Sequence, residues 1–309
     1  GKMLKNIMIA TVLIIPTFFI GCIKVETAFD TDLEKIQVVT SIEPIREVTQ
    51  IIGGDRIITK NIIKNGIDPH DYEPTSKDLI TLNNSQIFLY NGLGMEEWVN
   101  KVVDSIKDME VVVINTSENV DVIDENGNSI DNYNESMTKK KVDPHIWLSL
   151  TQCKVQSLNI KNALKSIDLE NSNYYEDNYN EFVSKMDSLY TEYKEKFDSL
   201  ENKNFVTSHT AFGYLCKDFG LNQVSIEESF GEGEITPSML KDLVNFCKEN
   251  NITTVFMPEV ASRRLSETLA NEANVKVVKI HSLESIPQNL TYLEAMRENL
   301  NIIYENLSR

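Results

Sequence analysis

The stretch "IQVVTSIEPIREVTQIIGGDRIITKNII", residues 36–63, decides the class of fold. Its first six residues, which include Ile36, Val38 and Val39, have the length and composition of a buried strand. Apolar residues then recur at helical spacing, at Ile45, Val48, Ile51 and Ile52. The glycine pair Gly53-Gly54 ends this pattern. A second strand-like run, "IITKNII", follows the glycines. Strand, helix and strand in this order predict a βαβ unit and a parallel sheet.

The same alternation extends along the chain in two blocks. The runs "QIFLYNG" and "VVVI" continue the first block, and "NFVTS", "QVSI", "TTVFM" and "VKVVKI" form the second, each separated from the next by a helical pattern or a loop. We therefore predict an α/β protein of two sandwich lobes with mostly parallel sheets, one over residues 36–168 and one over 204–309.

A long amphipathic segment, residues 169–203, lies between these blocks. Its apolar side chains are spaced by three or four residues: Tyr175, Tyr179, Phe182, Met186, Leu189, Tyr193, Phe197 and Leu200. One apolar stripe of this kind predicts a helix of about 26 residues, or roughly 40 Å at 1.5 Å per residue. We expect a rigid helix that joins the two lobes.

Residues 115–141 interrupt the alternation. This segment is polar, acidic and rich in asparagine, and it ends in a run of three lysines. Such a composition favours a mobile surface loop.

The amino terminus has the features of an export signal. Lys2 and Lys5 precede an apolar run from Ile7 to Ile20, which Gly21-Cys22 closes. We interpret residues 1–21 as a signal peptide, Cys22 as a lipidated cysteine that anchors the protein to the membrane, and 22–35 as the cysteine and a linker. The alternative is an ordinary signal peptide with an incidental cysteine.

The remaining cysteines and the charge exclude several classes of function. Cys153, Cys216 and Cys247 do not have the spacing of a thiolate metal site, and an odd number cannot all pair. We expect them to be small buried hydrophobic residues without a disulfide. The net charge of −17 argues against a nucleic-acid partner.

The chain contains four histidines, and three of them follow predicted strands. His70 comes after "IITKNII", His209 directly after "NFVTS", and His281 directly after "VKVVKI". The fourth, His145, precedes a predicted helix. Ligands of parallel α/β sheets bind beyond the carboxyl ends of the strands. Each lobe thus contributes two imidazoles, although any single histidine at a strand end can be an ordinary loop residue.

If the lobes face each other across a cleft, all four imidazoles can bind one ion. Imidazole suits zinc, copper, nickel and iron, whereas carboxylate and water suit manganese. Four protein ligands fill a tetrahedral zinc site and leave no position for water. Such a site binds a metal without hydrolysing a substrate, so we do not expect an enzyme.

Three longer motifs carry a family resemblance. "GIDPHDYEPTSKDL", "DPHIWLSL" and "SHTAFGYLCKDFGL" resemble segments of the metal-binding solute-binding lipoproteins of bacterial ABC transporters, which take up zinc or manganese. The resemblance extends over nearly the whole chain from about Ile36. It implies two α/β lobes joined by a rigid helix, with the metal held between them.

The resemblance also implies a set of ligands. His70, His145 and His209 match the family's first three ligand positions, and the third is histidine in zinc binders but glutamate in manganese binders. The fourth position is usually aspartate in the family, and His281 stands there in this chain. Glu259 or another carboxylate is an alternative fourth ligand.

The tripeptide Asp-Pro-His occurs twice, at residues 68–70 and 143–145. Proline fixes φ and stiffens the chain just before each histidine. We hypothesise that Asp68 or Asp143 accepts a hydrogen bond from an imidazole and so fixes its tautomer. The alternative is that each aspartate only caps a local turn.

These observations together predict a monomeric, lipid-anchored receptor on the outer face of the bacterial cell membrane. It would capture Zn²⁺, with Mn²⁺ less favoured, and deliver it to an ABC-transporter permease. The alternatives are a manganese or iron receptor of the same class and a surface adhesin. A zinc hydrolase would need an open coordination position, and the sequence has no HExxH motif.

Overall fold

The computed structural model describes residues 34–134, 141–227, 235–258, 262–287 and 289–309. The predicted signal peptide, Cys22 and most of the linker lie outside this part of the chain, as does Glu259. None of the helices within it has the length and apolar character needed to cross a membrane.

The first lobe is built around a four-stranded parallel sheet in the order β2-β1-β3-β4. Its strands are β1 (Ile36–Thr40), β2 (Ile57–Asn61), β3 (Ile87–Tyr90) and β4 (Val112–Asn115). The connecting helices are α1 (Glu43–Gly53), α2 (Ser76–Asn83) and α3 (Val99–Ile106). The βαβ unit predicted from residues 36–63 is confirmed, since β1 pairs in parallel with β2 from Ile36↔Ile57 to Thr40↔Asn61.

The second lobe repeats this design with the order β6-β5-β7-β8. Its strands are β5 (Asn204–Thr207), β6 (Asn222–Ser225), β7 (Thr254–Met257) and β8 (Lys276–Lys279). The helices are α6 (Gly213–Phe219), α8 (Pro237–Glu249), α9 (Arg263–Ala273) and α10 (Tyr292–Leu307). The predicted fold of two α/β lobes is therefore confirmed.

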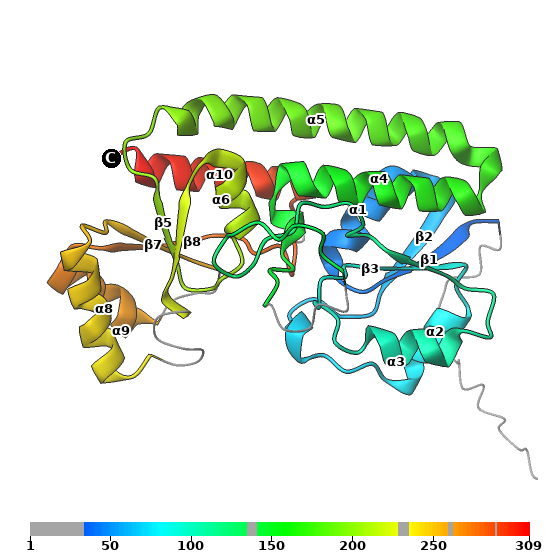
Figure 1. Ribbon diagram of the computed structural model, residues 1–309, viewed down its shortest axis with the longest axis horizontal. Helices are drawn as coiled ribbons and strands as arrows, with labels where there is room; N and C mark the ends of the chain where they lie inside the picture. The colour runs from blue at the N-terminus through cyan, green and yellow to red at the C-terminus, as the bar shows by residue number, and fades with distance from the viewer. Residues whose placement is uncertain (1–33, 135–140, 228–234, 259–261, 288) are drawn as a thin grey trace, which may run out of the picture.

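A helical layer lies over both lobes. Helix α4 (Leu150–Ile167) leads through a short 3₁₀ turn, Leu169–Asn171, into the 27-residue α5 (Ser172–Asp198). Figure 1 shows α5 bridging the two lobes, above α4 in the first lobe and α10 in the second. The side chains of the predicted stripe are buried except Tyr179, which is partly buried. The long connecting helix is thus present and is held by packing.

The segment after β4 differs from the predicted surface loop in its described part. Val120, Val122, Ile123 and Ile130 are buried in one apolar cluster with Ile146 and Tyr214. Short antiparallel bridges, Ile123↔Ser129 and Asp124↔Val142, hold its backbone. The reason is that a few aliphatic residues, scattered among asparagines and acids in the sequence, pack against Leu93 and Ile146 of the first lobe and Tyr214 of the second.

The three described cysteines are free and buried, as predicted. Burial raises the pKa of the Cys153 and Cys247 thiols to about 11. These cysteines therefore pack as small apolar side chains.

Candidate metal centre

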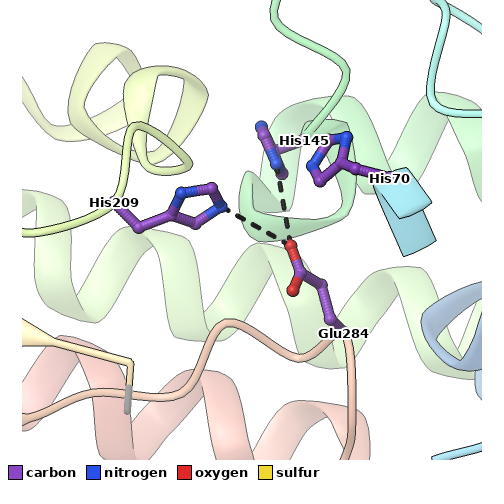
Figure 2. Close-up of side chains that lie close together, drawn as sticks. All are labelled: His70, His145, His209 and Glu284. Atoms are coloured by element: carbon purple, nitrogen blue, oxygen red, sulfur yellow. Dashed lines mark ion pairs between the residues drawn. The ribbon is translucent and has the colours of Figure 1, made fainter. Parts of the chain in front are cut away.

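Four segments from the two lobes place a donor group at the same point between them (Figure 2). His70 lies in a 3₁₀ turn, Pro69–Asp71, that follows β2. His145 directly precedes the 3₁₀ turn that leads into α4, and His209 follows β5. Glu284 belongs to the loop between β8 and α10. The carboxyl ends of both sheets thus contribute to one site, as expected for α/β folds.

The donor atoms of these four residues are close enough to share an ion. One ligand atom from each of His70, His145, His209 and Glu284 lies within 4.8 Å of the others. Glu284 Oε1 is 3.7 Å from Nε2 of His145 and 3.7 Å from Nε2 of His209. Donors held about 2.0–2.1 Å from one zinc ion at tetrahedral angles would lie about 3.3–3.4 Å apart. The observed spacing is slightly wider and fits an ion between the donors.

Two of these atoms are buried without a hydrogen-bond partner. Neither Nε2 of His145 nor Oε1 of Glu284 has a hydrogen-bond partner among the described residues. A buried polar atom without a partner costs on the order of 1–3 kcal/mol. A cation bound by both atoms would remove this cost. His70 is exposed, so the site is open to solvent on that side.

The turn before His145 orients its imidazole. Oδ1 of Asp143 accepts hydrogen bonds from the backbone N–H of His145 at 2.9 Å and from the ring Nδ1 at 2.8 Å. Because an ionised carboxylate can only accept, Nδ1 carries the proton and the lone pair of Nε2 faces the other donors. Asp143 therefore makes the contact with an imidazole that the sequence suggested for one of the two aspartates.

Asp68 makes only the first of these two contacts. Its Oδ1 accepts from the backbone N–H of His70 at 2.9 Å and caps the 3₁₀ turn. The two Asp-Pro-His segments thus share a backbone arrangement, an aspartate turn. Among the described contacts, only Asp143 also accepts a hydrogen bond from the histidine ring of its segment.

His209 has a carboxylate partner that the sequence analysis missed. Oε2 of Glu227 is 2.8 Å from the ring Nδ1 and accepts from the backbone N–H of Thr210 at 2.9 Å. Glu227 follows β6, so it lies beyond the carboxyl end of the strand next to β5. Its position just after a predicted strand was the one feature of the sequence that could have indicated this contact. Acidic residues are too common in this chain for that position to be decisive.

The carboxylates change the protonation of the site. Burial lowers the pKa of His209, but hydrogen bonding to Glu227 and the nearby charge of Glu284 outweigh it and raise that pKa to about 10. Burial raises the pKa of Glu284, whereas the adjacent His209 and the electrostatic influence of the surrounding imidazoles lower it, and the net direction is down. Without a metal, the site therefore holds a protonated His209 beside an ionised Glu284.

His281 does not join the group, contrary to the prediction. Its backbone N–H donates to Asn299 Oδ1 at 2.8 Å and its carbonyl accepts from Asn299 Nδ2 at 2.7 Å, both on α10. Its Nε2 is 2.8 Å from Oε2 of Glu298. These contacts hold His281 against α10, and Glu284 takes the fourth place in the cluster. The carboxylate that could replace His281 is thus Glu284, and the suggested Glu259 lies outside the described residues.

A family description matches most of the chain. Residues 38–306 match the family ZnuA, described as the periplasmic component A of a zinc-uptake complex. The chain belongs to the ZnuA family. The resemblance to metal-binding solute-binding proteins is thereby confirmed.

Known proteins are similar to this chain in sequence and in fold. The high-affinity zinc uptake system protein ZnuA of Bacillus subtilis is 32% identical over 285 residues, which cover 90% of this chain and 89% of that protein. The Zn(II)-bound ZnuA-like domain of Streptococcus pneumoniae AdcA superposes with a TM-score of 0.78 and 27% identity, over 89% of this chain and 100% of that one. The laminin-binding protein Lbp of Streptococcus pyogenes superposes with a TM-score of 0.72 and 29% identity, over 89% of this chain and 99% of that one.

Proposed function

We propose that the protein is an extracytoplasmic zinc receptor that passes the ion to an ABC-transporter permease. One observation supports this most directly. Three imidazoles and one carboxylate from both lobes offer donor atoms within 4.8 Å of one another, and two of these atoms are buried without a hydrogen-bond partner. The zinc named for the relatives agrees with this donor set.

The choice of zinc over manganese depends on the kind of donor. Three neutral imidazoles favour zinc, since manganese prefers carboxylate, carbonyl and water oxygens. The fourth donor, Glu284, is an oxygen ligand and not the fourth imidazole predicted from the sequence. We therefore expect zinc to be preferred by a smaller margin than a site of four histidines would give.

Four protein donors also argue against catalysis. A tetrahedral zinc ion bound by three histidines and one glutamate has no open position for an activated water molecule. We propose that the site only binds and releases its ion. An assay with generic ester and phosphate substrates in the presence of zinc should show no turnover.

The cellular location rests on the amino-terminal sequence. A basic, apolar and small-residue order ending at Cys22 supports export and lipidation of that cysteine. We propose a monomer anchored on the outer face of the membrane. Metabolic labelling with a radioactive fatty acid should mark the wild type and not Cys22→Ser.

Thermal unfolding with competing metals tests the choice of ion. Zinc should raise the melting temperature by binding the native state, which at 100 times the dissociation constant adds about 2.7 kcal/mol to the free energy of unfolding. Manganese at the same concentration should give a much smaller shift, and elemental analysis should find one zinc ion per chain. A larger shift with manganese would reverse the assignment.

An adhesin function has support only from a relative's name. The related structure described as a laminin-binding protein has the same fold. Binding of the purified protein to immobilised laminin, with and without zinc, tests this second role.

A further inference from the structure

Helix α6 belongs to the second lobe, but several of its side chains contact the first. Tyr214 donates to the carbonyl of Asp143, Lys217 to Oγ of Ser129, and Oδ2 of Asp218 accepts from Ser149 Oγ at 2.8 Å. This helix begins four residues after His209. Helix α6 therefore connects His209 to the segment that carries His145.

Tyr214 makes the most buried of these contacts. Its side chain is only 2% exposed, and its ring packs in the apolar cluster with Ile123 and Ile146. The hydroxyl donates to the carbonyl of Asp143 at 2.7 Å and accepts from the backbone N–H of Ile123 at 3.2 Å. Ile123 in turn accepts at its carbonyl from the backbone N–H of Asp143 at 3.0 Å. The hydroxyl thus joins the two backbone segments that hold Asp143.

The residue before Tyr214 touches the other end of Asp143. A Cβ atom on Gly213 would lie 2.8 Å from Oδ2 of Asp143, closer than such contacts allow. Glycine at this position leaves room for the carboxylate to reach His145. The α6 backbone and the Tyr214 hydroxyl therefore limit where both the carbonyl and the carboxylate of Asp143 can lie.

We propose that Tyr214 is a positioning residue for metal capture, which acts from the second lobe through Asp143 on the imidazole of His145. The proposal rests on the proposed function as a zinc receptor. Because Tyr214 and His209 share one short segment, the orientation of His145 is set relative to His209, whose ring centroid is 5.4 Å from that of His145. Two of the four donors are then pre-oriented across the interface between the lobes.

Tyr214→Phe tests this with the ring packing retained. Without the hydroxyl, Asp143 can shift and its hydrogen bond to the ring weakens. Zinc affinity should fall on the order of tenfold, the lower end of the range for groups that orient a metal ligand. Affinity is measured by competition with a chromophoric chelator. The second readout is the Nδ1–H signal of His145 in histidine-labelled, metal-free protein, which should be protected from solvent exchange in the wild type and lose protection in the variant.

Tyr175→Phe is the matched control. Tyr175 is also a fully buried tyrosine, and its hydroxyl donates to Oδ2 of Asp168 at 2.5 Å, between α4 and α5. This variant should lose stability to a similar extent but keep the affinity and the His145 signal of the wild type. Equal losses of affinity in the two variants would overturn the proposal, because the effect would then follow from stability alone.

Gly213→Ala is a second, independent variant. Its Cβ would lie 2.8 Å from Oδ2 of Asp143 and 3.0 Å from Cδ1 of Ile123, both ends of side chains, so the fold should persist while Asp143 is displaced from His145. We expect the same loss of affinity and of the protected signal as in Tyr214→Phe. Unchanged affinity in both variants would overturn the proposal. A wild type that binds no zinc but shows a protected signal dependent on Tyr214 would instead overturn the proposed function.

Discussion

Nε2 of His145 lies 3.7 Å from Oε1 of Glu284, and neither atom has a hydrogen-bond partner within the described parts of the chain. This distance is too long for a hydrogen bond. It suits two donors that bind the same small cation. The pair joins a side chain of the first lobe to one of the second, so an ion between them would hold the two lobes together.

The first prediction concerns the fourth donor. Glu284→Gln keeps the shape of the side chain but replaces the carboxylate with a neutral amide, a poor zinc ligand. Zinc affinity should fall by more than about 100-fold, beyond the range for groups that only orient a ligand. The control is His281→Gln, which should keep wild-type affinity because His281 contacts α10 and Glu298. Isothermal titration of both variants with zinc shows which residue is the fourth ligand. A loss of affinity in His281→Gln but not in Glu284→Gln would restore His281 as that ligand.

The second prediction separates the two Asp-Pro-His segments. Asp143→Asn removes the charge that accepts from the His145 ring, and zinc affinity should fall about 10- to 100-fold. Asp68→Asn should have a smaller effect, since Asp68 bonds only to the backbone of His70 and asparagine can cap the same turn. Chelator competition on the two variants checks this. Equal affinities of both variants and the wild type would exclude a role for Asp143 in orienting the ring.

The sequence predicted the fold well because its signals are local. The strands and helices follow from the apolar spacing within short windows, as in residues 36–63, and parallel pairing follows from their alternation. The same reasoning placed His70 and His209 beyond the carboxyl ends of their strands, and they meet because the two lobes face each other, as the sequence analysis assumed.

The fourth donor could not be predicted because it depends on one backbone angle. Leu283 has a φ of 59°, a conformation that leucine rarely adopts, and it is fully buried. The chain bends at residues 283–285, where Glu284 contributes to the cluster, while His281 stays against Asn299 of α10. A leucine in a sequence does not indicate a left-handed turn. Only tertiary packing of the loop determines which side chain reaches the site.

The third prediction concerns pH. The pKa of His209 is raised from 6.5 to about 10 in the metal-free protein, so zinc must displace a proton from this ring at neutral pH. Affinity should keep rising above pH 7, by about tenfold per unit from this group, and should not level off near the ordinary histidine pKa. Titration calorimetry in buffers of different ionisation enthalpy should detect at least about one proton released at pH 7.5. Affinity that is constant from pH 7 to 9 would contradict this.

The same group makes the metal-free protein sensitive to pH. Because the folded-state pKa of His209 is above its unfolded value of 6.5, its contribution to stability is complete below 6.5 and is lost as pH rises toward about 10. Glu227→Gln removes the nearest charge and should shift this loss to lower pH. Chemical unfolding between pH 6 and 10 measures the free energy of unfolding of the wild type and of Glu227→Gln. Equal pH profiles would exclude Glu227 as the cause of the raised pKa of His209.

The last prediction concerns release of the ion. The backbone N–H of Gly66, in the loop that carries His70, donates to Oγ of Ser285 at 2.9 Å, next to Glu284. This bond holds together two loops from different lobes, and it must break if the loops separate. Ser285→Ala should therefore speed zinc dissociation by about two- to tenfold, corresponding to about 0.5–1.5 kcal/mol for one hydrogen bond, with little change in association. Stopped-flow mixing with excess chelator measures the rate, and Ser105→Ala, a surface serine that bonds only within α3, is the control. An unchanged dissociation rate in Ser285→Ala would mean that the ion leaves without separation of these two loops.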